Sequence, residues 1–319
     1  MILRGLAALA LAASASTPGG AGGFTFADPA IDEASALVVL PGGLYATTND
    51  SGDTGRVFVV DGSGRTVGVT RWEESPRDVE ALAPAPSGSD VWVGDIGDNT
   101  ASRSEIEVAR VPVGAGERSV DPTVYRLAYP DGAHDAETLL CDPATGRLYV
   151  ATKGWLGGTL YAAPQHLVAG RDNPMRAVAA VLPMATDGTF LPDGHTVLIR
   201  GYFSATTYAW PSMDKIASFP LPKQKQGEGV GVAPDGTVWL SSEGIHAPVI
   251  SLALPANALP AADPSDSSAP KVTTRPATSD GSTGAAGGAS TGSDWWPWAL
   301  GGVAGIAIIA ALLRSLRSR

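Results

Sequence analysis

Short runs of alternating apolar and polar residues fill the middle of the chain, from residue 24 to residue 255, and turns rich in glycine, proline and aspartate separate them. Alternation with a period of two residues is typical of β-strands that bury one face. The runs come in groups of four. The first group has runs at 36–40, 44–48, 56–61 and 66–72.

An acidic phrase opens the first strand of several groups, at intervals of about 45 to 57 residues. The phrase occurs as Asp78-Val79-Glu80, as Asp135-Ala136-Glu137 and as Gln226-Gly227-Glu228, and Asp187 lies at the matching place of a further group. Repeats of this length made only of strands are typical of radial β-arrays, in which each unit buries its faces against its neighbours. The sequence therefore predicts an all-β fold, a β-propeller of five four-stranded blades. A sixth, degenerate blade around 163–182 and a β-sandwich are the alternatives.

The last group contains only three strands, at 228–232, 237–241 and 248–254. Phe24–Ala27 is a β-rich segment with no partner of its own. We expect it to add to the last blade and close the ring, because a closed ring has no long exposed sheet edge.

Both ends of the chain differ from this middle region. Residues 1–20 hold one early arginine, an apolar run and small residues, which predicts a signal peptide. Residues 295–313 are uncharged, begin with tryptophans and are followed by three arginines, which predicts a transmembrane helix. The predicted order is a propeller at 24–255, a disordered stalk at 256–294, the helix, and a basic cytoplasmic tail at 314–319. We therefore expect a single-pass protein of the cell membrane with the propeller outside.

The composition of the chain restricts the classes of partner that we expect it to bind. A formal net charge of −10 argues against nucleic acid and permits cations or a cell-envelope ligand or protein. Cys141 is the one cysteine of the chain, so an intrachain disulfide is excluded. We expect Cys141 to be buried in its strand.

Acidic side chains should gather on one face of the disc, because the start of each inner strand and the loop between its second and third strands lie on the same side. We predict metal ligands at the inner-strand starts, namely Asp78, Glu80, Asp135, Glu137 and Glu228. We predict a ligand-binding face in the loops, formed by Asp50, Asp53, Asp95, Asp98, Asn99, Lys153 and Glu243.

Crowded carboxylates repel one another unless a cation compensates. Oxygen ligands favour Ca²⁺ or Mg²⁺, and Ca²⁺ is the cofactor we expect. For the loop acids the alternative is a structural role, paired with Arg56, Arg103 and backbone amides. His134 is a weak candidate for a general base, since no nucleophile accompanies it.

The phrases Asp78-Val79-Glu80-Ala81-Leu82, Gly94-Asp95-Ile96-Gly97-Asp98-Asn99 and Asp135-Ala136-Glu137-Thr138-Leu139 carry a resemblance. Together with Gln226-Gly227-Glu228-Gly229, they resemble a family of exported actinobacterial β-propeller proteins of unassigned activity. More distantly, Glu228-Gly229 is similar to the opening phrase of gluconolactonase-like and phytase-esterase-like propellers. That similarity implies a calcium site at the channel mouth rather than a reaction.

Three functions remain open from the sequence. The first is a membrane-anchored binding module with an acidic, calcium-binding channel mouth. The second is a metal-assisted hydrolase of a phosphoester or lactone. The third is a structural or sensory role. Fold alone does not decide among them.

Overall fold

The computed structural model describes residues 22–50, 52–73 and 75–260. The predicted signal peptide, residues 261–294 of the predicted stalk, the predicted helix and the tail lie outside these residues. Within the described residues no helix is long and apolar enough to span a membrane. Their helical part is the single 3₁₀ turn η1 (Ala256–Ala258).

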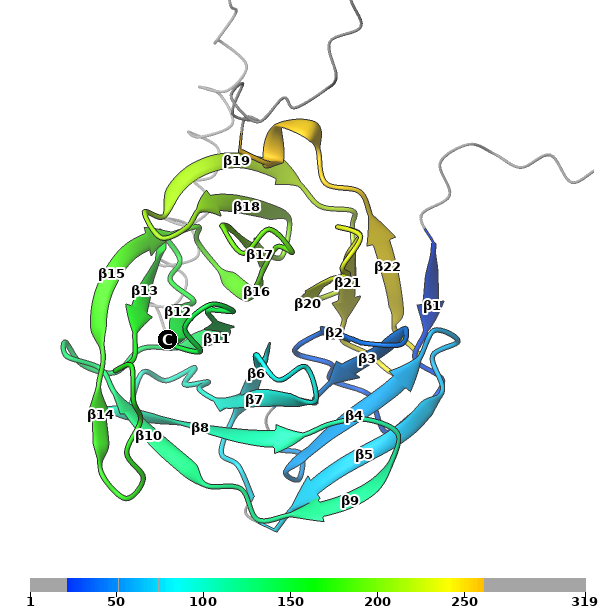
Figure 1. The fold of residues 1–319 in the computed structure, drawn as a ribbon, viewed down its shortest axis with the longest axis horizontal. Helices are drawn as coiled ribbons and strands as arrows, with labels where there is room; N and C mark the ends of the chain where they lie inside the picture. The colour runs from blue at the N-terminus through cyan, green and yellow to red at the C-terminus, as the bar shows by residue number, and fades with distance from the viewer. Residues whose placement is uncertain (1–21, 51, 74, 261–319) are drawn as a thin grey trace, which may run out of the picture. The chain divides into compact units, whose positions relative to one another are not determined.

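Five sheets surround a central axis as the blades of a propeller, and within each of them the blade's own successive strands pair antiparallel (Figure 1). The five-blade count predicted from the sequence is thus confirmed, and the described residues form neither a sixth blade nor a sandwich. The innermost strands contact their neighbours around the ring. From blade 1 to blade 5 they are β2 (Val38–Leu40), β6 (Val79–Pro84), β11 (Ala136–Cys141), β16 (Ala185–Phe190) and β20 (Gly227–Val232).

The second, third and fourth strands follow outward from each inner strand. In blade 1 they are β3 (Leu44–Thr47), β4 (Arg56–Asp61) and β5 (Thr66–Trp72), and in blade 2 β7 (Asp90–Asp95), β8 (Glu105–Pro112) and β10 (Val124–Ala128). In blade 3 they are β12 (Leu148–Thr152), β13 (Gly158–Ala162) and β15 (Arg176–Val181), and in blade 4 β17 (Thr196–Gly201), β18 (Ser204–Ala209) and β19 (Asp214–Pro220). Blade 5 has β21 (Val238–Ser242) and β22 (Pro248–Leu252).

Blades 1 and 2 each carry a fifth strand that the sequence pattern did not predict. β9 (Gly116–Val120) pairs in parallel with β5, and β14 (Asp172–Pro174) pairs in parallel with β10. Each comes from the connection that follows the neighbouring blade's third strand. The residues around 163–182 therefore extend blades 2 and 3 instead of forming a sixth blade.

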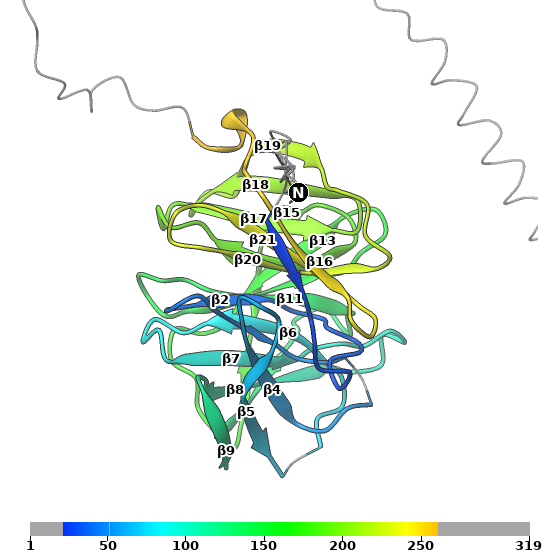
Figure 2. The same ribbon diagram turned by 90° about the vertical axis from the view of Figure 1, so that its right-hand side faces the viewer.

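The N-terminal strand closes the ring as expected. β1 (Gly23–Thr25) pairs antiparallel with β22, with Phe24 opposite Val249. Figures 1 and 2 both show β1, in dark blue, alongside the gold strand β22. The ring of Phe24 packs against Tyr45 of blade 1 and Trp239 of blade 5, at centroid distances of 4.8 and 6.0 Å. One strand thus ties the last blade to the first.

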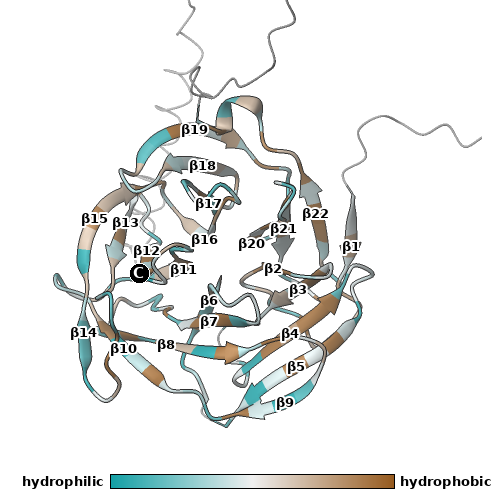
Figure 3. Cartoon of the chain, viewed as in Figure 1, coloured by the Kyte–Doolittle hydropathy of each residue, from teal (hydrophilic) through white to brown (hydrophobic). Residues whose placement is uncertain are grey.

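The core lies between adjacent blades. Both faces of each sheet are covered, so inner strands such as β11, β12 and β17 are buried throughout. The outer strands β15 and β19 are largely exposed, and Figure 3 shows teal segments in them at the rim. Cys141 is buried as expected, between blades 2 and 3.

Candidate functional site

One face of the disc, here called the mouth face, carries the starts of the inner strands and the loops between second and third strands. Backbone hydrogen bonds join the two sets: Gly97 N donates to Asp78 O at 3.1 Å and Lys153 N donates to Asp135 O at 2.8 Å. Adjacent strands of a blade run in opposite directions, which places these positions on the same side. The predicted acidic residues therefore lie on the mouth face.

Three of the predicted acids come together as a cluster, which we call the acidic triad. Asp50 follows β3 in blade 1, whereas Asp78 and Glu80 begin β6 in blade 2. One carboxylate oxygen from each lies within 4.8 Å of the others. The Asp50 and Asp78 side chains are hydrogen-bonded to each other, and Ser35 Oγ lies 2.7 Å from Glu80 Oε2. The second oxygen of the Asp78 carboxyl, Oδ1, is buried and has no hydrogen-bond partner among the described residues.

Burial dominates the electrostatics of the triad. Burial, and then the Glu137 and Asp50 carboxylates, raise the pKa of Glu80 to about 10. Burial and the Asp50 carboxylate raise the pKa of Asp78 to about 7. At neutral pH the triad therefore holds protons or a cation, because low-dielectric surroundings disfavour several negative charges close together.

The Gly-Asp-Ile-Gly-Asp-Asn run places a loop directly against the triad. A Cβ atom on Gly97 would lie 2.4 Å from Asp78 Oδ2 and 2.8 Å from Glu80 Cγ. Only glycine allows this approach without displacing both carboxylates. The backbone of the Gly-Asp-Ile-Gly-Asp-Asn run thus forms a wall of the site.

Two acids of this run hold the loop in place. Asp95 accepts hydrogen bonds from Arg77 N at 2.7 Å and Asp78 N at 3.0 Å, and it forms a buried ion pair with Arg103. Asp98 accepts from Arg103 N at 2.6 Å, and hydrogen bonds lower its pKa although burial opposes them. Asp95 also orients Asp78 through the amide of that residue.

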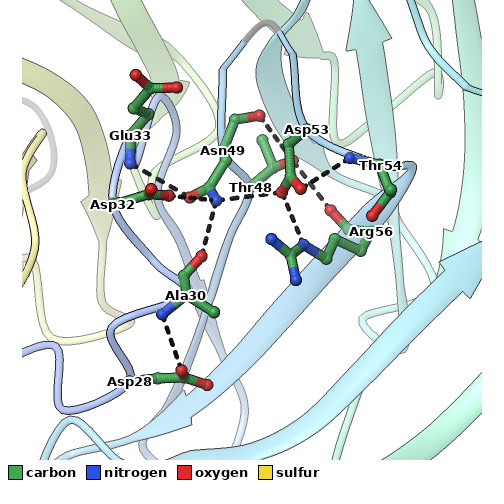
Figure 4. A network of polar contacts seen from close by, with 9 residues as sticks. All are labelled: Asp28, Ala30, Asp32, Glu33, Thr48, Asn49, Asp53, Thr54 and Arg56. Atoms are coloured by element: carbon green, nitrogen blue, oxygen red, sulfur yellow. Dashed lines mark hydrogen bonds and ion pairs between the residues drawn. The ribbon is translucent and has the colours of Figure 1, made fainter.

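The corresponding loop of blade 1 is built in the same way (Figure 4). Asp53 accepts hydrogen bonds from Asn49 Nδ2 at 3.1 Å, Thr54 N at 2.7 Å and Arg56 Nε at 2.7 Å. Asn49 Nδ2 also donates to Ala30 O at 2.8 Å. These bonds fix the backbone that carries Asp50, so Asp53 shapes the loop.

Glu137 and Glu228 lie on blades 3 and 5 and are as buried as Glu80. Glu137 Oε1 is paired with Lys153, whose ammonium lies 5.2 Å from the centre of the Tyr202 ring. Burial and the Glu228 carboxylate raise the pKa of Glu137 to about 9, while burial raises that of Glu228 to about 7. In each carboxyl the Oε2 atom is buried without a hydrogen-bond partner in the described part of the chain.

Arg200 is the residue of this region that the sequence analysis missed. It is fully buried in β17 and donates to Gly229 O at 3.1 Å and Gln224 Oε1 at 3.2 Å. Burial lowers its pKa to about 10. An arginine within the apolar run Val197–Gly201 was the available signal, since a charge in a buried strand needs fixed partners.

Asp187 joins three blades. Its carboxylate accepts hydrogen bonds from Gly188 N and Val230 N, both at 2.7 Å, and from Leu37 N at 3.3 Å. Burial raises its pKa. It therefore fastens the inner strands together.

The remaining predicted residues lie around the triad rather than in it. Asp135 accepts from Asp98 N at 2.9 Å, Glu243 accepts from Gln226 Nε2 at 2.7 Å, and Asn99 is exposed. His134 Nε2 lies 3.0 Å from Asp131 Oδ1 and 3.1 Å from the Tyr161 hydroxyl. These partners of His134, Asp131 and Tyr161, lie at blade 3, where Tyr161 belongs to β13.

No protein-family model matches the sequence, and no curated protein matches it. Among solved structures, a glucose dehydrogenase aligns with 12% identity and a TM-score of 0.44, covering 70% of this chain and 97% of that one. Sqt1 of Chaetomium thermophilum, bound to the N-terminus of a ribosomal protein, aligns with 15% identity and a TM-score of 0.37, covering 69% and 58%. The β-propeller assignment rests on the five sheets described above.

Proposed function

We propose that the protein is an extracytoplasmic β-propeller binding module, anchored to the cell membrane, whose acidic triad binds Ca²⁺. The observation that carries the proposal is the meeting of Asp50, Asp78 and Glu80, three carboxylates from two blades, within 4.8 Å. The partnerless oxygen of Asp78 supports it further. Carboxylate groups in this number suit a hard cation that takes six to eight oxygen ligands.

The donor set fits calcium better than other common ions. The triad offers only oxygen atoms, whereas zinc and copper sites use histidine or cysteine. Mg²⁺ demands near-ideal octahedral geometry and usually keeps several waters. When bound, Ca²⁺ would neutralise the triad and offer a positive centre to the oxygens of a ligand at the mouth.

The place at the membrane is supported by the sequence of the two ends and by where the described chain leaves the propeller. β22 begins on the mouth face and ends on the opposite face, and η1 packs against β19 beyond it. The stalk predicted from sequence therefore starts opposite the triad. A chain that stops before Trp295 should be released into the medium, and its retention on membranes would contradict the anchor.

Calorimetric titration of the full-length protein with CaCl₂ and MgCl₂ tests the cation. We expect tighter binding of Ca²⁺, with loss of binding in Glu80→Gln and Asp78→Asn. Asp121→Asn is the matched control, since Asp121 is exposed and lies outside the triad. Unchanged calcium binding in both triad variants, or no binding by the wild type, would refute the site.

Metal-assisted hydrolysis is the alternative, and the same protein samples separate it. We expect no turnover of phosphoester and lactone panels with Ca²⁺ present. Turnover that requires Ca²⁺ and disappears in Glu80→Gln would make the protein a hydrolase instead of a binding module. His134→Gln then tests the predicted base.

A further inference from the structure

Exposed apolar side chains gather on the mouth face. Trp155 and Leu156 are 83% and 102% exposed, Phe203 is 81% exposed and Ile245 is 60% exposed. They occupy the loops between second and third strands of blades 3, 4 and 5, respectively. We call these four residues the apolar tips.

The mouth face is thus divided. The equivalent loops of blades 1 and 2 carry acids, among which Asp53 is paired with Arg56 and Asp95 with Arg103. The loops of blades 3 to 5 instead present apolar side chains to solvent. Exposed apolar residues are ordinary when scattered, but a set on one face of the molecule indicates an interaction surface.

An acidic groove lies beside the apolar tips. It has a volume of about 670 Å³, and its lining combines the acids Asp32, Glu33 and Glu243 with Ile245, Lys223 and Lys225. Burial raises the pKa of Glu243, and the Asp50 and Glu33 carboxylates raise it further. The carboxylates of Glu33, Asp50 and Glu243 therefore lie close enough to influence one another at this end of the groove.

Buried acceptors continue inward from this side of the mouth. Glu137 and Glu228 are 4% and 3% exposed, and one oxygen of each has no hydrogen-bond partner in the described part of the chain. A buried carboxylate oxygen without a donor is costly. A polar group brought by a ligand at the mouth would reduce that cost.

We infer, on the basis of the proposed binding function, that the mouth face binds a protein segment with a lysine or arginine flanked by apolar residues. The basic side chain lies between Glu33 and Glu243, and the apolar residues pack on the apolar tips. Charge complementarity selects the basic group. Leu156 and Ile245 favour a protein over a sugar, because protein interfaces bury aliphatic and aromatic side chains together around charged anchors.

Selection of a random peptide library displayed on phage, against the full-length protein in lipid nanodiscs, tests this inference. We expect enriched peptides that carry a lysine or arginine between apolar residues. Binding of the synthesised peptide should weaken about tenfold or more in Phe203→Ser/Ile245→Ser and in Glu243→Gln. Trp155→Ser/Leu156→Ser is a second variant with the same expectation. The control Val178→Ser/Leu259→Ser removes two exposed apolar side chains away from the mouth face and should bind like the wild type.

Several results would overturn the inference. They are the absence of enriched peptides, enriched peptides without a basic residue, and peptide binding that the mouth-face variants leave unchanged. Binding of phosphatidylglycerol vesicles through the apolar tips would assign the face to a membrane. A dimer that Phe203→Ser/Ile245→Ser dissociates would assign it to a second copy of this chain.

The calcium titration separates this inference from the proposed cation site. The apolar-tip variants leave the triad intact and should bind Ca²⁺ like the wild type. Peptide binding without calcium binding would refute the proposed cation site and leave the peptide inference standing. Calcium binding without peptide binding would sink the partner alone.

Discussion

Replacing Glu80 by glutamine should stabilise the cation-free protein at neutral pH. In the folded protein the pKa of Glu80 is raised to about 10 by burial and by the neighbouring Glu137 and Asp50 carboxylates, whereas its ordinary value is 4.5. At pH 7 the Glu80 carboxyl is ionised in the unfolded chain, so it must take up a proton when the protein folds. The gap of about 2.5 pKa units between 4.5 and pH 7 corresponds to about 3 kcal/mol.

Glutamine removes this cost because it is neutral in both states and has nearly the same shape. Its side-chain oxygen can still accept the hydrogen bond that Ser35 Oγ makes with Glu80 Oε2. For a domain of this size, about 3 kcal/mol corresponds to a rise in melting temperature of about 6–12 °C.

The pH dependence has a definite sign. Since the folded-state pKa of Glu80 is the higher one, the wild type loses stability as the pH rises above 4.5 and stops losing it near pH 10. The difference in free energy of unfolding between Glu80→Gln and the wild type should therefore vanish near pH 4.5 and grow through neutral pH. Calcium should nearly cancel this difference at a hundredfold excess over Kd, because it stabilises only the wild type, by about 2.7 kcal/mol, and it should reverse the order at a thousandfold excess, where it contributes about 4.1 kcal/mol.

Thermal melts followed by circular dichroism, in chelator and in CaCl₂ across this pH range, measure the effect. Glu73→Gln makes the same chemical change at an exposed position and should leave the melting temperature unchanged. The reasoning is refuted if Glu80→Gln in chelator is less stable than the wild type at pH 7. A stabilisation that does not change with pH would refute it as well, since it could not come from a proton.

Two further substitutions test the loop and the ring closure. Gly97→Ala should weaken calcium binding about tenfold or more, because its Cβ would lie 2.4 Å from Asp78 Oδ2, and an unchanged calorimetric Kd would contradict the role of this glycine. Phe24→Ala should cost about 3–5 kcal/mol, since the buried ring joins blade 5 to blade 1. A melting temperature equal to that of the wild type would show that the ring closes without it.

Local pattern was enough to predict most of the fold. Alternation and turn residues located the strands of the first and last blades within a few residues, and the missing strand of blade 5 pointed to a segment that overlaps β1. These features depend on neighbours close in sequence, which is why they can be read along the chain. The acidic repeat likewise placed its members on one face, because strand direction alternates within every blade.

The tertiary structure decided which of those acids meet. Asp50 reaches Asp78 and Glu80 from another blade, while Asp95 is neutralised by Arg103 within its own loop. Asp50 and Asp95 occupy similar places in the sequence repeat, yet the burial and the charges around the two carboxyls differ. The pKa of a carboxyl depends on distances across the channel and on exclusion of water, and no local pattern contains either.

The additional strands β9 and β14 and the buried Arg200 were also decided only in three dimensions. A strand that pairs in parallel with the edge of another blade needs no distinctive residues of its own, since backbone groups make the contact. Arg200 finds one acceptor, Gly229 O, on the inner strand of blade 5 and another, Gln224 Oε1, on the segment that leads into this strand. Sequence determines the repeating unit, and packing between units determines the electrostatics of the site they enclose.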